Sequence, residues 1–545
     1  MNVRAKELKT DVVIVGGGVG GCAAALSSLR EGCRVILTED SEWIGGQLTS
    51  QAVPPDEHGW IERFGCTRSY RQFRDGVRDY YRRHYPLTDA ARQDSFLNPG
   101  NGWVSPLCHE PRVALAVLES MLAPYVSSGR LTILTEHKLI AADVAGDWVR
   151  AVTVRDSRAG HEQVIIARYF LDATELGDLL PLSGTEFISG AESQTQTGEP
   201  SAKAEAQPDN VQAFSVCFAM SHYEGEDHII ERPSDYDFWR EFVPDLQPAW
   251  TGRLFSWTIP HPRMMQPHTY NFDPHRESSK AFSGLWTYRR ILDRGNFTPG
   301  FFTSDISLVN VPQIDYLLGD ICDATPEQRR AHIQRAKRQS LSFLYWMQHE
   351  APRPDGGLGF PGLRLRGDVT NSSDGLAKRP YIRESRRIKA EFTIYEQHVA
   401  ADARPKGANR AEQFVDSIGI GYYRIDLHPS TGGDNYLDVK SLPFQIPLGA
   451  LIPQRIENLL PACKNIGTTH ITNGCYRLHP VEWNIGEAAG VLAAFCLAHS
   501  TTPRDVRHSP HLLQDFQRQL EHVGVELAWP PDIVLAEGDP HRHAM

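Results

Sequence analysis

The most constraining feature of the sequence is a run of glycines between two apolar segments, in residues 11–39. Residues 11–15 (Asp-Val-Val-Ile-Val) are typical of a buried parallel strand, and residues 22–30 have the composition of a helix. Residues 34–38 are typical of a second strand, which ends at Glu39. This order is the full context of a Gly-x-Gly-x-x-Gly dinucleotide-binding motif: a strand, a glycine turn, a helix, a second strand and an acid. We therefore expect a Rossmann-type α/β fold.

Each position in the glycine run has a role in binding a dinucleotide. Gly16 permits the tight turn, Gly18 lets the backbone approach a pyrophosphate, and Gly21 lets the helix pack against the sheet. The helix begins near Val19 and Gly20, so its first N–H groups, which have no partner within the helix, face the phosphates. We assign these five residues to the cofactor site.

The acidic end of the second strand distinguishes between dinucleotides. Glu39, eighteen residues after Gly21, is placed to accept hydrogen bonds from ribose hydroxyls, and Asp40 follows it. An acid there disfavours a 2′-phosphate, so NADP is not expected. The same glycine pattern recurs in residues 357–362, but no apolar strand precedes it and Pro361 stands where a helix should open. We interpret that segment as a loop, which leaves a single dinucleotide site.

A second glycine pair favours FAD over NAD. Small residues and a hydroxyl side chain follow the acid closely, in the order Gly45, Gly46, Gln47, Leu48 and Thr49. Small residues permit a second backbone pass along an extended cofactor, and Thr49 can donate to phosphate or ribityl oxygens. An ordinary turn is the alternative, but NAD-dependent dehydrogenases usually continue a regular series of strands and helices here.

Two later segments support the flavin interpretation. Residues 164–171 are typical of a strand, and the small and acidic residues after it suit contact with ribose and pyrophosphate. The cofactor residues assigned from this region are Ala173, Thr174, Gly177 and Asp178, to which we add Leu139. Residues 482–494 predict a glycine- and alanine-rich helix, whose N-terminal turn can hold N–H groups against the flavin O2/N1 edge. The residues assigned from it are Gly486, Glu487 and Ala488; a small-residue helix packed in the core is the alternative.

With these motifs the sequence resembles a known family, the FAD-dependent oxidoreductases with a glutathione-reductase-type Rossmann domain, in the branch labelled "FAD-dependent oxidoreductase" or "xanthan-lyase-related". The resemblance is carried by Glu39 and by residues 11–21, 45–49, 172–178, 310–316, 381–388 and 477–490. It covers roughly residues 10–500 and is specific for FAD but not for a substrate. It implies that residues 477–490 close over the isoalloxazine. His479-Pro480 departs from the more apolar pair that is frequent in relatives.

The predicted fold is α/β, with a Rossmann-type FAD-binding domain containing a parallel sheet and a substrate or cap domain containing an antiparallel sheet and helices. We place the FAD-binding domain in residues 1–210 and 446–500, the cap domain in residues 211–445 and a C-terminal extension in residues 501–545. Within the cap, alternating residues 212–218 predict a strand and residues 326–348 predict a helix.

Histidines and a tryptophan motif in the cap region have more than one interpretation. His261, His268 and His275 recur at seven-residue intervals beside prolines, so we expect loop histidines rather than a metal site. Residues 255–260 partly match the Trp-x-Trp-x-Ile-Pro motif of flavin-dependent halogenases, but Phe255 replaces the first tryptophan. A halogenase is therefore a minor alternative.

A cluster of arginines also has two interpretations. Arg383, Arg386 and Arg387 are typical of a solvated basic helix face. Alternatively, Arg383 or Arg386 binds an anionic group of the substrate.

The chemistry we expect is oxidation of a CH–OH or CH–NH group in a small polar or aromatic substrate, with hydride transfer to flavin N5. A neutral histidine suits the base that removes the heteroatom proton, and His470 and His479 flank the segment that contacts the flavin. A C=C reductase or desaturase with Arg477 as proton donor is the main alternative. A monooxygenase and a non-catalytic flavin-binding protein are the others. Oxygen or another external acceptor then takes the electrons.

Composition limits the partners and the setting. Lys and Arg number 56 against 67 Asp and Glu, and the net charge of −11 argues against nucleic acid or an anionic membrane as partner. No stretch of about eighteen apolar residues occurs, because Glu487 interrupts the longest candidate, residues 485–498. The nine cysteines form no Cys-x-x-Cys pair, and the N-terminus lacks the apolar core of a signal peptide. We therefore expect a soluble cytoplasmic protein, and the sequence leaves a homo-oligomer open.

Overall fold

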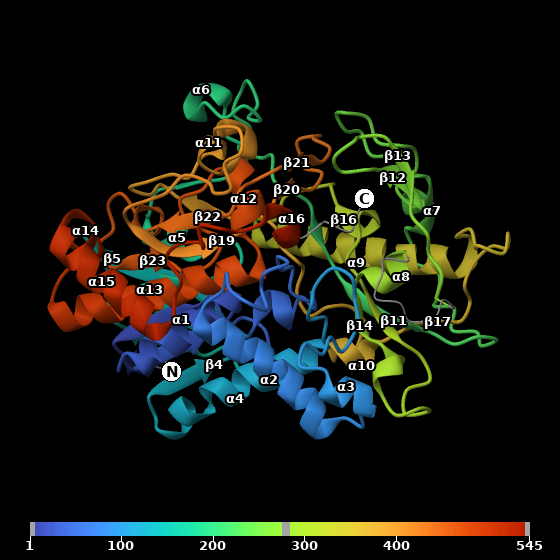
Figure 1. The fold of residues 1–545 in the computed structure, drawn as a ribbon, viewed down its shortest axis with the longest axis horizontal. Helices are drawn as coiled ribbons and strands as arrows, with labels where there is room; N and C mark the ends of the chain where they lie inside the picture. The colour runs from blue at the N-terminus through green and yellow to red at the C-terminus, as the bar shows by residue number, and fades with distance from the viewer. Residues whose placement is uncertain (1–5, 275–283, 540–545) are drawn as a thin grey trace.

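The computed structural model describes residues 6–274 and 284–539, which are organised around a parallel sheet (Figure 1). The strands run in the order β23 (Leu459–Pro461), β8 (Tyr169–Asp172), β2 (Val12–Val15), β3 (Val35–Thr38) and β4 (Leu131–Leu134). All of these pairings are parallel. Helix α1 (Val19–Arg30) connects β2 to β3. The predicted strand–turn–helix–strand unit and the α/β fold are confirmed.

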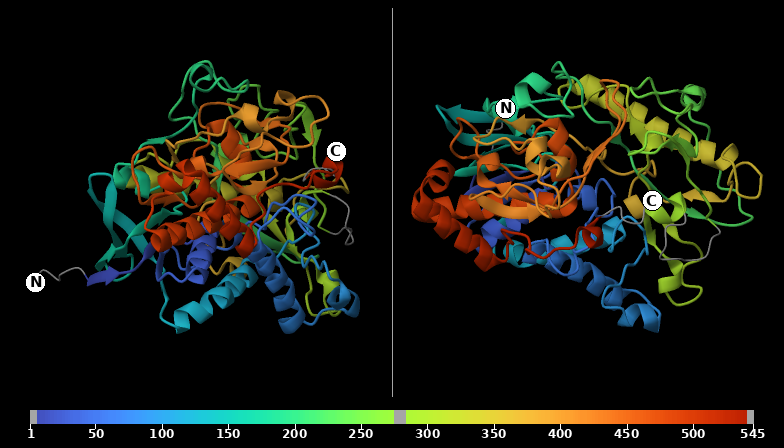
Figure 2. Two further views of the ribbon diagram at one scale, coloured as in Figure 1. Left: turned by 60° about the vertical axis from the view of Figure 1, so that its left-hand side comes forward. Right: turned by 45° about the horizontal axis from the view of Figure 1, so that its top comes forward.

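The C-terminal helix α13 (His479–His499) packs against α1 with little space between the two backbones. A Cβ atom on Gly486 would lie 2.0 Å from the carbonyl oxygen of Gly20. The Ser27 hydroxyl donates across the same contact to the carbonyl oxygen of Glu487, at 3.0 Å. Figure 2 shows the C-terminal helices directly against the N-terminal unit in two further views. The two ends of the chain thus build one core.

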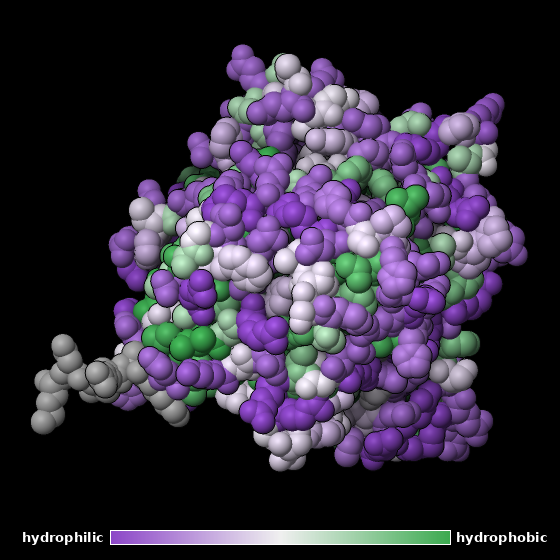
Figure 3. Space-filling view, turned by 90° about the vertical axis from the view of Figure 1, so that its left-hand side faces the viewer, coloured by the Kyte–Doolittle hydropathy of each residue, from purple (hydrophilic) through white to green (hydrophobic). Residues whose placement is uncertain are grey.

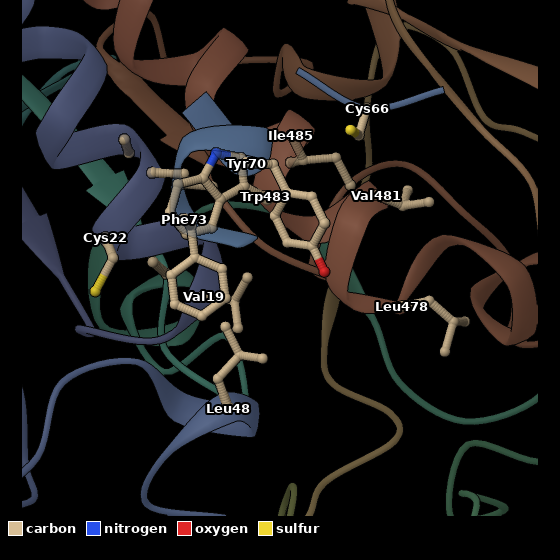
Figure 4. Close-up of a cluster of buried hydrophobic side chains, with 14 of the residues drawn as sticks. Val19, Cys22, Leu48, Cys66, Tyr70, Phe73, Leu478, Val481, Trp483 and Ile485 are labelled. Carbon is tan, nitrogen blue, oxygen red and sulfur yellow. The ribbon is translucent and has the colours of Figure 1, made fainter. Parts of the chain in front are cut away.

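A cluster of large apolar side chains completes this core (Figure 4). It joins Val19 and Cys22 of α1, Trp483 and Ile485 of α13, and Tyr70 and Phe73 of helix α2 (Arg68–His84). The Trp483 indole N–H donates to the Ser69 hydroxyl at 2.6 Å, so the buried ring keeps its polar atom paired. Packing of α2 on α13 therefore depends on both apolar area and hydrogen bonding.

Three of the predicted cofactor residues lie on α13, and their assignment to the cofactor site stays a prediction. Gly486, Glu487 and Ala488 lie within the helix and are buried against the protein, and none of them lines the cavity beside the glycine turn. The Glu487 carboxylate accepts a hydrogen bond from the Ser69 hydroxyl at 2.5 Å. The small residues of this helix serve close packing on α1, which is the alternative that the sequence left open.

A second sheet lies beside the parallel one and has the order β1-β7-β6-β5. Its strands are β1 (Lys6–Lys9), β7 (Glu162–Ile166), β6 (Trp148–Asp156) and β5 (His137–Ala145). The single strand predicted for residues 164–171 is wrong, since β7 ends at Ile166 and β8 begins at Tyr169 in a different sheet. Both halves are apolar, so the sequence pattern does not show where the chain crosses between sheets.

The cap region contains the predicted antiparallel sheet, in the order β14-β15-β11-β17. Its strands are β14 (Arg290–Leu292), β15 (Ile306–Val309), β11 (Phe218–His222) and β17 (Leu363–Leu365). Helix α9 (Pro326–His349), capped by the Thr325 side chain, confirms the predicted helix. The strand predicted over residues 212–218 is instead a short β10 (Phe214–Ser215) followed by β11. The glycine pattern of residues 357–362 lies in the loop before β17, as expected.

The described residues after 500 pack back on the molecule. They form α14 (Pro503–His508), α15 (Pro510–Val523) and α16 (Leu535–Gly538). Trp529 is buried, and its indole N–H donates to the carbonyl oxygen of Phe444 at 2.9 Å. The boundaries of the predicted domains stay predictions.

Shorter elements connect these parts. The helices are α3 (Asp89–Gln93), α4 (Pro111–Ser127), α5 (Leu179–Ser183), α6 (Gln194–Thr197), α7 (Tyr236–Glu241), α8 (Leu285–Tyr288), α10 (Gly367–Thr370), α11 (Glu396–Val399) and α12 (His470–Tyr476). The strands are β9 (Phe187–Ile188), β12 (Thr258–Pro260), β13 (Pro267–Thr269), β16 (Asp315–Tyr316), β18 (Arg387–Ile388), β19 (Ser417–Gly421), β20 (Ile425–Leu427), β21 (Leu437–Val439) and β22 (Phe444–Pro447).

Helix α13 is, among the described residues, the one helix long and apolar enough to cross a membrane by length and composition. Of its most apolar window, 89% is buried inside the protein, as for the core helix of a globular fold. Hydrophilic residues cover most of the face shown in Figure 3, with small hydrophobic groups between them.

The α1–α13 contact predicts a large effect of adding one methyl group. We expect Gly486→Ala to lower the free energy of unfolding by about 3 kcal/mol, because the new Cβ meets a backbone carbonyl oxygen that cannot move aside. The control Gly146→Ala adds a Cβ where no atom lies within 4 Å, at φ +61°, and should cost only about 1 kcal/mol. Chemical denaturation of both variants measures the difference; equal losses would contradict the packing argument.

Candidate active site

The nucleotide-binding turn lies at the carboxyl end of β2. Gly16 has a φ of +99°, and a Cβ there would lie 2.3 Å from the carbonyl oxygen of Ala173, so only glycine fits. Glu39 at the end of β3 accepts hydrogen bonds from the backbone N–H groups of Gly17 and Ser41, each at 2.9 Å. These bonds fix the carboxylate beside the turn.

A cavity of about 370 Å³ opens beside this turn, and we call it the cofactor cavity. The predicted cofactor residues that line it are Gly16, Gly18, Glu39, Asp40, Gly46, Leu139, Ala173, Thr174 and Asp178. Sequence reasoning missed Ser50, Gln51 and Glu175, which also line it. Ser50 and Gln51 follow the predicted residues 45–49, and Glu175 lies within residues 172–178, so the motifs locate the site but not its full wall.

The other predicted cofactor residues do not line this cavity. Besides the α13 residues described above, they are Val19, Gly20, Gly21, Gly45, Gln47, Leu48, Thr49 and Gly177. Thr49 is a specific correction, because its buried hydroxyl donates to the carbonyl oxygen of Ile44 at 2.5 Å. A hydroxyl carries one proton, so this bond leaves Thr49 no proton for a phosphate or ribityl oxygen.

Three charged side chains, Lys464, Glu175 and Glu482, meet beside the glycine turn. Lys464 is buried and forms an ion pair with Glu175. Glu482 accepts a hydrogen bond from the Gln47 amide at 2.7 Å, and burial raises the pKa of Glu482 to about 7. The Oε1 atom of Glu175 is buried without a hydrogen-bond partner in the described structure, 3.0 Å from where a Cβ of Gly18 would lie. A buried acceptor without a donor fits a ligand that brings hydroxyl groups.

A second cavity, of about 170 Å³, lies across residues 379–383, and we call it the substrate cavity. Pro380 and Ile382 line the cofactor cavity. Tyr381 and Arg383 line the substrate cavity. Since alternate residues of an extended segment point to opposite sides, this segment is the wall between the two cavities.

The substrate cavity combines aromatic rings with paired charges. Its aromatic lining comprises Trp103, Tyr270, Tyr288, Tyr381, Tyr423 and Tyr436. Arg477, a predicted catalytic residue, also lines it. Arg477 donates to the Tyr381 hydroxyl at 3.0 Å and to the carbonyl oxygen of Asp426 at 3.1 Å. These two bonds hold the guanidinium in one orientation at the cavity wall.

The arginine cluster is not a solvated helix face, so that prediction is wrong. Arg383, Arg386 and Arg387 lie in an extended segment, and all three are buried. Each pairs with carboxylates, including Arg383 with Asp315 at 3.0 Å and Arg387 with Glu384 at 2.6 Å. Arg383 alone of the three lines the substrate cavity, which is compatible with the alternative that it binds an anionic group.

The two histidines predicted as bases lie outside the substrate cavity lining. His470 Nδ1 contacts Glu384 at 2.9 Å, and the ring lines a third cavity of about 270 Å³. Burial lowers the pKa of His470, but its pair with Glu384 outweighs burial and holds the pKa above its ordinary value. The Nδ1 of His479 accepts the backbone N–H of Asp56 at 3.1 Å, and burial lowers the pKa of His479 to about 4.

A different histidine, His428, lines the substrate cavity. Its Nδ1 contacts the Asp315 carboxylate at 2.6 Å, and its Nε2 lies 3.9 Å from Asp426. Burial and the neighbouring Arg383 lower the pKa of His428. Sequence reasoning missed it because no local motif joins His428 to Asp315, which is more than a hundred residues earlier.

The spaced histidines of the cap do not form a metal site in the part of the chain that the structure describes. No group of three or more potential metal ligands occurs among those residues. His261 lines the substrate cavity, while His268 lies in β13 rather than in a loop. His275 lies outside the described residues.

The family profile described as "FAD dependent oxidoreductase" matches residues 11–520. Among curated proteins, none matches the chain. Several solved structures match part of it. The flavin-dependent monooxygenase PieE in complex with FAD and substrate is 14% identical, with a TM-score of 0.28, and the match covers 71% of this chain and 52% of that one.

Two further solved structures show shorter matches. L-proline dehydrogenase from P.horikoshii is 18% identical over 34% of this chain and 24% of that one, with a TM-score of 0.18. The bacillithiol disulfide reductase of Bacillus cereus is 18% identical over 31% of this chain and 41% of that one, with a TM-score of 0.19. The matches span from about a quarter to about half of the length of these three solved structures.

Buried carboxyl groups predict that the cofactor-free protein loses stability as the pH rises. Burial raises the pKa of Glu39 to about 8, and the pKa values of Asp172, Glu199 and Glu482 to about 7. The folded chain binds these protons more tightly than the unfolded chain. Their contribution is therefore complete below about pH 4 and is lost as the pH rises to about 8. We expect Tm to fall between about pH 7 and 8.5, above the range in which buried histidines such as His479 add stability as the pH rises.

Glu482→Gln removes one of these titrating groups and should make the fall in Tm shallower. The matched control Glu42→Gln changes a half-exposed carboxylate and should leave the slope unchanged. A Tm that stays constant or rises over this pH range would contradict the assignment of raised pKa values.

Proposed function

Because the chain belongs to the FAD dependent oxidoreductase family, we propose that it is an enzyme that oxidises a CH–OH or CH–NH group of a small polar or aromatic substrate. FAD is its cofactor, and the bound flavin supplies the hydride acceptor, N5. The observation that carries the proposal is the pair of His428 and Asp315 at the substrate cavity.

The residues of the cofactor cavity fit FAD. The glycine turn presents backbone without side chains at Gly16 and Gly18, which suits a pyrophosphate at the N-terminus of α1. The Glu39 carboxylate lines the same cavity and accepts hydrogen bonds from ribose hydroxyls. The unpaired Glu175 Oε1 is a further acceptor for a hydroxyl of the cofactor. These four residues therefore bind and orient FAD.

His428 has the properties of a general base. Its contact with Asp315 keeps the ring proton on Nδ1, so Nε2 carries the lone pair that takes a proton. Burial lowers the pKa of His428, which keeps the ring neutral before reaction. His428 then removes the proton from the substrate O–H or N–H at Nε2. Asp315 stabilises the imidazolium that forms.

His428 replaces His470 and His479 in this proposal for physical reasons. Neither ring lines the substrate cavity. A base must reach the proton that it removes, and only the His428 ring of the three meets that requirement.

A C=C reductase or desaturase is the second candidate, favoured by one observation. Arg477 lines the substrate cavity beside Tyr381, which gives this chemistry a proton donor at the site. Product analysis separates the two candidates, because oxidation yields a new carbonyl or imine and desaturation yields a new alkene. The electron acceptor, oxygen or another compound, is a separate assignment that turnover with and without oxygen would test.

His428→Asn should slow flavin reduction by about 10²- to 10⁴-fold, the usual contribution of a general base. A screen of small alcohols and amines that bleach the yellow protein without oxygen first identifies a reductant. Stopped-flow absorbance then gives the reduction rate of each variant against pH. We expect the rise of the rate with pH, which reports deprotonation of the base, to disappear in His428→Asn.

Three comparison variants make this test specific. His470→Asn and His479→Asn should each keep the pH step, because their rings lie outside the substrate cavity. His508→Asn, an exposed change on α14, is the matched control and should behave as the parent protein. Loss of the pH step in His470→Asn or His479→Asn, with His428→Asn unaffected, would reassign the base.

Glu39→Ala should weaken FAD binding by about 2- to 10-fold, since a hydrogen bond between uncharged groups contributes about 0.5–1.5 kcal/mol. Titration of apoprotein with FAD, followed by flavin fluorescence, measures the dissociation constant. Glu42→Gln, three residues later and half-exposed, should bind FAD as tightly as the parent protein. Equal affinity for Glu39→Ala and the parent would remove Glu39 from the cofactor site.

A further inference from the structure

Three buried arginines, Arg289, Arg383 and Arg477, surround Tyr381 in the substrate cavity. Arg477 donates to the Tyr381 hydroxyl at 3.0 Å, and the guanidinium carbon of Arg383 lies 5.0 Å from the centre of the tyrosine ring. Arg289 interacts electrostatically with the same tyrosine. The structure therefore concentrates positive charge around one ring, in a cavity of about 170 Å³.

Each of these arginines has one carboxylate partner and one unused donor. The ion pairs are Arg289–Asp56 at 3.2 Å, Arg383–Asp315 at 3.0 Å and Arg477–Asp426 at 3.5 Å. The Nε–H group of each arginine is buried and has no hydrogen-bond partner in the described structure. Buried donors are normally paired, and an unpaired one costs free energy. All three arginines line the same cavity, and guanidinium groups bind ligands that bring acceptor oxygens.

The charge of the cavity limits the charge of that ligand. We count the charged side chains that line the cavity together with those that form ion pairs with them. There are five arginines and four aspartates in this set. They are Arg263, Arg289, Arg383, Arg424 and Arg477 against Asp56, Asp315, Asp426 and Asp438. With His428 neutral, one positive charge is left over. A ligand with a single negative charge neutralises it, whereas a dianion leaves an uncompensated charge in a buried site.

The size and lining of the cavity limit the rest of the ligand. A cavity of about 150 Å³ is large enough for benzene. The substrate cavity, at about 170 Å³, therefore holds a body of about one six-membered ring together with a small polar group. Aromatic side chains such as Trp103, Tyr288 and Tyr436 supply faces for the apolar part of that body.

We propose that the substrate carries one carboxylate group, bound by Arg289, Arg383 and Arg477, on a body about the size of a six-membered ring. Guanidinium groups bind carboxylates through planar N–H···O pairs, which ammonium groups cannot reproduce. Asp315 contacts both Arg383 and His428, so the carboxylate site and the base share one anchor. The claim that this ligand is the substrate rests on the proposed oxidation. The claim that the cavity binds a carboxylate is tested by binding alone.

The test compares two probes of the same shape on the FAD-loaded protein. Benzoate carries the charge, and benzamide is its neutral counterpart. Isothermal titration calorimetry should show benzoate binding at least about tenfold more tightly, a difference of about 1.4 kcal/mol. At pH 8, where inorganic phosphate is mainly a dianion, phosphate should bind more weakly than benzoate. Equal binding of benzoate and benzamide, or no binding of benzoate, would overturn the proposal.

Arg477→Lys keeps the charge but removes the planar pair of donors, and should weaken benzoate binding about tenfold while leaving benzamide binding unchanged. The control Arg253→Lys changes an exposed arginine and should leave both affinities unchanged. Benzoate affinity that is unaltered in folded, FAD-loaded Arg477→Lys would overturn the assignment. If that variant does not fold, the comparison of benzoate with benzamide on the parent protein decides the question.

The outcomes separate this inference from the proposed function. In one outcome, benzoate binds tightly but no ring-sized hydroxy or amino acid bleaches the flavin. This outcome would contradict the proposed oxidation and support the carboxylate site. In the other outcome, a neutral alcohol or amine bleaches the flavin, and benzoate binds no more tightly than benzamide. This outcome would support the proposed oxidation and contradict the carboxylate site.

Discussion

The backbone contact between α1 and α13 determines where an active site can form in this protein. A Cβ atom on Gly486 would lie 2.0 Å from the carbonyl oxygen of Gly20, so the two helices pack backbone against backbone. Because α13 begins at His479, this contact fixes its N-terminal end beside the glycine turn and carries Arg477, two residues earlier, into the substrate cavity. The glycine turn and part of the substrate cavity wall are thus positioned by one packed pair of helices.

Electrostatics organises the substrate cavity through shared aspartates. Asp315 contacts both Arg383 and His428, so one carboxylate holds a substrate-binding group and the proposed base. Burial alone would raise the pKa of Asp315, but Arg383 and His428 outweigh it and keep the pKa below its ordinary value. An ionised Asp315 in turn favours protonation of His428 during reaction, which is what a general base requires.

Local sequence patterns predicted the nucleotide turn well and the substrate cavity poorly, for a physical reason. The strand, turn, helix and acid of residues 11–39 are adjacent in the chain, so their spacing alone defines the site. The substrate cavity is assembled from distant segments, and nothing near His428 in the sequence indicates Asp315 or Arg383. Likewise, the buried Arg387 pairs with Glu384 in its own segment and with the distant Glu192. The burial of Arg387 was therefore not predictable from the local sequence.

The most direct test of the account is a crystal structure of the FAD-loaded protein. We expect the adenosine ribose to contact Glu39. We expect the isoalloxazine ring to border the wall of residues 379–383, open to the cavity that contains Tyr381 and His428. An isoalloxazine ring that is separated from that cavity by intact protein, with no path between them, would contradict the assignment of the substrate site and of the base.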